Sequence, residues 1–118
     1  MTINQHEKRH HRRFEVGLPI SFTGKEKGLG IVRNLSKCGC QMECKGDIAS
    51  GDCLMLHITL STDEASLVIQ VATVRGCDDG LFNIAFLVME AKEQERLKVY
   101  LSNLEQTDTH KNPQSYCE

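Results

Sequence analysis

The chain has 118 residues, of which 40% are hydrophobic and 25% charged, and its formal net charge at pH 7 is −2. This length and composition support one domain with a single modest core and exclude two full domains. No apolar run approaches the roughly 18 residues that span a bilayer, and the polar, basic N-terminus lacks the apolar region of a signal peptide. The sequence therefore predicts a cytoplasmic protein without membrane insertion.

The charge is unevenly distributed along the chain. Residues 1–45 contain nine Lys and Arg against four Asp and Glu, whereas residues 46–118 contain five against twelve, so that a net +5 is followed by a net −7. A basic N-terminal part on a mildly acidic protein favours a localised anionic ligand over a long nucleic acid, which normally requires a strongly basic domain.

The N-terminal residues 1–13 show no apolar periodicity and contain the run KRHHRR. Repulsion within this run opposes compaction, which predicts a flexible basic arm. The pattern changes at Phe14, where FEVGLPISFT alternates imperfectly between apolar and polar residues. Pro19 within this segment indicates an edge strand, because proline cannot donate a ladder hydrogen bond.

Six short segments in all are rich in β-prone residues and are separated by turn-rich sequences. In chain order they are FEVGLPISFT, GIVRNLS, GCQMEC, DCLMLHITL, LVIQVATVRGC and LFNIAFLVM. Short strands with brief connections indicate an all-β fold, either an antiparallel barrel or a sandwich.

One helix is predicted over residues 90–105, where apolar residues recur every three or four positions. The stripe consists of Leu97, Tyr100, Leu101 and Leu104. We expect it to pack against one end of the strands, with a homodimer or partner contact as the alternative, while Glu93 and its acidic neighbours complement the helix dipole. Residues 105–118 predict a disordered tail, so the domain should span residues 14–104.

The six cysteines make up about 5% of the chain, below the roughly 8 to 10% typical of a disulfide scaffold, and we expect reduced thiols. The spacing of Cys38, Cys40 and Cys44 is not the paired CxxC of zinc sites, and no metal is predicted. These thiols more simply belong to the core, and we expect Cys53 and Cys77 to be similar.

Two motifs carry the functional interpretation. Arg9 to Arg13 read RxxxR, and Asn34 to Gly39 read [D/N]xSxxG, with 21 residues from Arg13 to Asn34. Alone, the first would be a solvated basic run and the second a Ser or Asx turn between strands. In this order and setting, the motifs resemble those of the PilZ domain family over about residues 7–104.

The resemblance implies a six-stranded antiparallel PilZ-type β-barrel with a C-terminal α-helix, and cyclic di-GMP as the ligand. Arginine suits this ligand because its planar fork can bond guanine O6 and N7 or clamp a phosphate. Asn34 can accept from a guanine N1/N2 edge, and a glycine permits close backbone approach.

The implied ligand-binding residues fall into three groups. The principal contacts are Arg9, Arg13, Asn34, Ser36 and Gly39. Lys8 directly precedes the first motif and Arg12 lies within it, and both add positive charge. Arg75 lies where several relatives place an aromatic or basic residue against guanine and could stack by its guanidinium plane, although it is equally a strand-end surface charge.

The family resemblance implies a receptor or adaptor that couples the second messenger to motility, biofilm or exopolysaccharide output through an unidentified effector protein. No nucleophile elbow, phosphate-binding loop, carboxylate pair or HExxH motif is present, so neither an enzyme nor a cofactor is predicted. Two alternatives remain. One is a PilZ-like interaction module without ligand binding. The other is a small nucleic-acid-binding barrel, disfavoured by the net charge and by only six aromatic residues for stacking.

Overall fold

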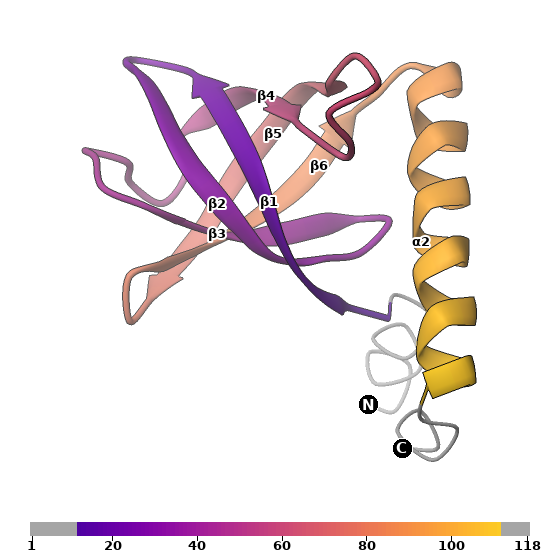
Figure 1. Cartoon of the computed structure of the whole chain (residues 1–118). Helices are drawn as coiled ribbons and strands as arrows, with labels where there is room; N and C mark the ends of the chain where they lie inside the picture. Colours follow the sequence, from indigo (N-terminus) through magenta and orange to yellow (C-terminus); the bar gives the residue numbers. More distant parts are fainter. Residues whose placement is uncertain (1–11, 112–118) are drawn as a thin grey trace, which may run out of the picture.

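The computed structural model describes residues 12–111 of the chain. Its elements are β1 (Phe14–Thr23), β2 (Lys27–Leu35), β3 (Gly39–Cys44), β4 (Cys53–Ile58), β5 (Leu67–Asp78), β6 (Leu81–Val88) and α2 (Ala91–Lys111). The strands form a closed antiparallel barrel in the order β1-β2-β3-β6-β5-β4, and α2 lies beside it (Figure 1). The predicted six-stranded barrel with one C-terminal helix is confirmed.

Closure of the barrel corrects the prediction that β1 is an edge strand. β1 pairs with β2 on one side and with β4 on the other. The β1–β4 pairing begins at Ile20, so Pro19 lies at the end of that ladder, where its carbonyl accepts a 2.9 Å bond from the Thr59 amide. Proline is tolerated at such a ladder end because the missing N–H interrupts no central pairing.

The barrel core follows the alternation of the strands. On β4, Leu54, Leu56 and Ile58 are buried, whereas Cys53, the first residue of the strand, points outward and is exposed. The expectation that Cys53 and Cys77 belong to the core is therefore wrong. Cys53 is out of phase with its apolar neighbours, and Cys77 lies one residue before the end of β5, beside the exposed β5–β6 turn.

The apolar stripe of α2 packs on the barrel, as predicted. Leu97 and Leu101 are buried, and Tyr100 and Leu104 are partly buried against the same core. The helix continues to Lys111, past its predicted end at residue 105 and into the segment that the sequence predicted as a disordered tail. No proline occurs between the stripe and Pro113, so no proline ends the helix earlier. Pro113 itself disfavours a helical conformation of the residue before it, close to where α2 ends.

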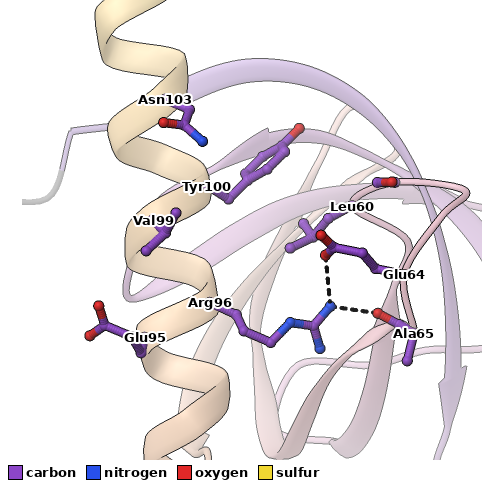
Figure 2. A pocket seen from close by; sticks show the side chains of 9 residues that line it. Leu60, Glu64, Ala65, Glu95, Arg96, Val99, Tyr100 and Asn103 are labelled. Carbon is purple, nitrogen blue, oxygen red and sulfur yellow. Dashed lines mark hydrogen bonds and ion pairs between the residues drawn. The ribbon is translucent and has the colours of Figure 1, made fainter.

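A polar junction fixes the start of α2 against the barrel. Glu93 is only 6% exposed, and its carboxylate accepts a 2.7 Å hydrogen bond from the Val68 amide of β5. Arg96 donates to the same carboxylate and reaches the β4–β5 loop, where it bonds the Ala65 carbonyl at 2.5 Å and Glu64 at 3.4 Å (Figure 2). Glu93 is thus a buried anchor as well as an acidic residue in the first helical turn.

In the described part of the chain, no helix combines the length and the apolar character needed to cross a membrane.

Candidate functional site

The strand pairing brings the two sequence motifs together at one edge of the barrel. Arg13 directly precedes β1 and Asn34 lies near the end of β2, and antiparallel pairing places Glu15 opposite Asn34. The Arg13 guanidinium donates a 2.9 Å hydrogen bond to Asn34 Oδ1. The structure therefore unites one residue from each motif, although 21 positions separate them.

Two residues that the sequence analysis missed extend this contact across the sheet. Asn34 Nδ2 donates to Gln41 Oε1 on β3, and Gln41 Nε2 donates to Asn83 Oδ1 on β6 at 2.8 Å. The register places Asn34 opposite Gln41 and Gln41 opposite Asn83. We call the line Arg13–Asn34–Gln41–Asn83 the polar row.

Ser36 shapes the β2–β3 turn from inside. Its side chain is buried, and its hydroxyl donates to the Gly39 carbonyl at 3.3 Å and accepts from the Cys38 amide at 3.2 Å. The Ser36 amide also donates to the Gly39 carbonyl. The hydroxyl thus holds the turn in shape beside Asn34, while direct contact of Ser36 with a ligand stays a prediction.

Gly39 has a packing role in this turn. A Cβ atom at this position would lie 2.2 Å from the Ile84 carbonyl oxygen of β6. Because β3 and β6 approach so closely here, only glycine fits without moving one of the strands. The requirement for glycine comes from the strand pairing itself, and the sequence-based role in ligand approach stays a prediction.

The remaining predicted site residues lie in different settings. Arg12 points toward α2, with its guanidinium 4.7 Å from the Phe14 ring centre and 3.6 Å from Glu105. Arg75 is exposed at an irregularity of β5, between residues paired with Ile84 and Asn83, and so lies next to the end of the polar row. Lys8 and Arg9, like most of the predicted arm, lie outside the described residues.

Burial controls the chemistry of the thiols near the site. Desolvation raises the pKa of Cys40 from 9.0 to about 12, with a smaller opposing effect from the Arg13 guanidinium. Cys38 is exposed, so the expectation that it belongs to the core is wrong, because it lies in the turn between Ser36 and Gly39 and not on a strand. Among residues 12–111, no group of three or more His, Cys, Asp or Glu side chains is placed to hold a metal ion.

We expect iodoacetamide to modify Cys38 readily in the native protein at pH 8 and to leave Cys40 unmodified. A thiol with a pKa of about 12 has roughly a thousandfold less thiolate at this pH than one with a pKa of 9, and the thiolate is the reactive form. Tandem mass spectrometry of the peptide containing both residues measures the two rates. The urea-unfolded protein, in which both should react alike, is the control. Equal rates in the folded protein would show that Cys40 is accessible.

The closed six-stranded antiparallel barrel with its terminal helix, and the arginine–asparagine edge between its first two strands, are the architecture of a PilZ-type domain. The family model described as PilZ domain matches residues 7–103, so the chain belongs to the PilZ domain family. No curated protein matches the chain.

Two solved structures share the fold. The first is Bacillus subtilis Inhibitor of motility (MotI/DgrA), with a TM-score of 0.65 and 20% identity over 81% of this chain and 51% of that one. The present chain therefore spans about half the length of that protein. The second is the PilZ domain of CeSA from a cellulose-synthesizing bacterium, with a TM-score of 0.62 and 13% identity over 80% of this chain and 98% of that domain.

Proposed function

We propose that this chain is a cytoplasmic cyclic di-GMP receptor or adaptor whose ligand binds at the barrel edge that carries Arg13 and Asn34. The observation that best supports the proposal is the 2.9 Å contact between these two side chains, because it brings the two family motifs to one place. Lys8 and Arg9 would add further positive charge from the N-terminal side. Membership of the PilZ family supports the ligand class.

The chemistry of the edge suits a guanine dinucleotide. Arg13 is exposed and offers a fork of donors to guanine O6 and N7 or to a phosphate. Asn34 Oδ1 has two lone pairs, so it can retain Arg13 and still accept from a guanine N1 or N2 proton. Arg75, beside the end of the polar row, would stack on the base or neutralise a phosphate.

The chain itself would carry out no reaction, and the signal would pass to an effector protein through surface contacts. The two similar structures carry names that refer to motility and to cellulose synthesis. We therefore propose motility or exopolysaccharide and biofilm formation as the output.

We expect isothermal titration of the full chain with cyclic di-GMP to give saturable heat, and Arg13→Ala to weaken binding roughly 5- to 150-fold, as expected for loss of one bidentate arginine–base contact. Arg33→Ala is the matched control, because Arg33 is an exposed arginine of β2 whose guanidinium is 2.6 Å from Glu43. Its affinity should equal that of the wild-type protein.

Three results would count against this function. If cyclic di-GMP produced neither heat nor NMR shifts with the wild-type protein, the chain would not be a cyclic di-GMP receptor. If Arg13→Ala bound cyclic di-GMP as tightly as the wild-type protein, the ligand would not bind at Arg13. Binding of single-stranded nucleic acid whose affinity falls steeply with salt, in preference to cyclic di-GMP, would favour the nucleic-acid alternative.

A further inference from the structure

The polar row has a fixed direction, which begins at Arg13. A guanidinium group only donates hydrogen bonds, so the atom of Asn34 that meets Arg13 must be its oxygen. The Asn34 amino group then points away and requires an acceptor, which is Gln41 Oε1. Gln41 Nε2 in turn requires an acceptor and meets Asn83 Oδ1 at 2.8 Å. Each amide orientation therefore follows from the preceding one.

We propose that Gln41 and Asn83 are positioning residues that hold the Asn34 amide with its oxygen toward the ligand. This inference rests on the proposed function and deepens it. A carboxylate at position 34 would present an acceptor in either orientation, whereas an asparagine presents an acceptor in one orientation and a donor in the other. The polar row selects the acceptor orientation and so lets Asn34 act toward guanine as an aspartate would.

The strands give this arrangement its rigidity. Gln41 lies between Cys40 and Met42, both fully buried, and Asn83 lies between the buried residues Phe82 and Ile84. Both amides are partly buried and project from paired strands instead of loops. Side chains supported in this way hold a neighbouring group more accurately than loop residues do.

The direction of the row has a consequence for base selectivity. Guanine presents N–H donors at N1 and N2, which match an acceptor at Asn34, whereas adenine presents an unprotonated N1, which matches a donor. Loss of Gln41 removes one of the two contacts that orient the Asn34 amide and leaves only that with Arg13, so the amide turns its amino group toward the ligand more readily. The preference for cyclic di-GMP over cyclic di-AMP should then fall together with the affinity for cyclic di-GMP.

The test is a double-mutant cycle between Gln41→Met and Asn34→Asp. Methionine is close in size to glutamine and removes both hydrogen bonds. We expect Gln41→Met to weaken cyclic di-GMP binding about fivefold or more when residue 34 is asparagine, the loss typical of one hydrogen bond. We expect less than about a twofold effect in the Asn34→Asp background, because a carboxylate needs no orientation.

The matched control is Gln70→Met, at an exposed glutamine of β5 away from the row, which should bind as the wild-type protein does. Melting midpoints of all variants exclude unfolding as the cause of any loss. An equal loss in the two backgrounds would overturn the positioning role, since Gln41 would then act on the ligand directly or through the general structure. Unchanged affinity of Gln41→Met in the asparagine background would also overturn it.

A second readout separates this inference from the proposed function. The side-chain amide protons of Asn34 in the ligand-free protein should shift upfield and exchange faster with water in Gln41→Met, because their acceptor is lost. Failure of the wild-type protein to bind cyclic di-GMP would remove the proposed function, while these resonances would still report on the orientation. Identical Asn34 resonances in the wild-type protein and Gln41→Met would show that Gln41 does not hold the amide.

Discussion

Gly39→Ala should lower the melting temperature of the protein by roughly 10 to 20 °C, the drop expected for a loss near 3 kcal/mol in a domain of this size. The added methyl group would lie 2.2 Å from the Ile84 carbonyl oxygen, and a backbone atom of a paired strand cannot rotate away as a side chain can. Relief requires β3 and β6 to separate where Gly39 pairs with Ala85 and where the Phe86 amide donates to the Cys38 carbonyl.

The same substitution should weaken ligand binding even in the fraction that stays folded, because the Gly39 carbonyl accepts the two bonds from Ser36 that shape the turn. Gly17→Ala is the matched control. Gly17 also lies in a strand and a Cβ there would meet nothing within 4 Å. Differential scanning calorimetry gives the melting midpoints of both variants. A midpoint of Gly39→Ala within a few degrees of that of Gly17→Ala would contradict the packing role of Gly39.

Local sequence patterns were sufficient to predict the elements of this fold. Alternating residues on β4 and the spacing of Leu97 and Leu101 on α2 are properties of short segments, and the structure reproduces them. The proximity of Arg13 and Asn34 could also be predicted, because the family motifs imply that the two residues share one site. That inference needed the resemblance, since neither motif is specific alone.

The rest depends on features that no local pattern encodes. Gln41 and Asn83 are outward-facing polar residues of a kind that every strand carries, and only the register of β3 against its two neighbours makes them a continuous row with Asn34. Cys77 pairs with the buried Phe82 and is nevertheless exposed, because it lies one residue before the end of β5, beside the β5–β6 turn. The pairing of β1 with β4, which closes the barrel beside Pro19, likewise had no local sequence signal.

The buried carboxylate of Glu93 is a further feature that required the tertiary structure. A glutamate in a first helical turn is usually an exposed group that complements the helix dipole. Here the barrel wall covers it, because β5 begins directly opposite the start of α2 and offers the Val68 amide at 2.7 Å. Arg96, one turn later, supplies the compensating positive charge at 3.2 Å and 3.3 Å from the two carboxylate oxygens.

Glu93→Ala is expected to reduce the stability of the α2–barrel contact by about 3 kcal/mol, because it removes one member of a buried ion pair and leaves the Val68 amide without its acceptor. The side chain of Arg96 is 28% exposed, so water partly replaces its lost partner and the cost should not exceed this value. Amide hydrogen exchange should show protection in α2 falling about 100-fold, with a smaller change in the strands.

Two variants bracket this effect. Glu93→Gln keeps an oxygen for the Val68 amide and loses only the charge, so we expect a reduction of about 1 kcal/mol. Glu95→Ala changes an exposed glutamate of the same helix and should stay within about 0.5 kcal/mol of the wild-type protein. Unchanged α2 protection in Glu93→Ala would contradict the anchoring role.

The amide-exchange protection lost from α2 and from the strands in Glu93→Ala also tests whether the helix separates before the barrel unfolds. The six strands close on one another without α2, which is held by one apolar stripe, the Glu93–Arg96 junction and the ion pair between Glu105 and Arg12. A helix attached in this way can separate before the barrel unfolds. Equal loss in α2 and in all strands would instead show that helix and barrel unfold as one cooperative unit.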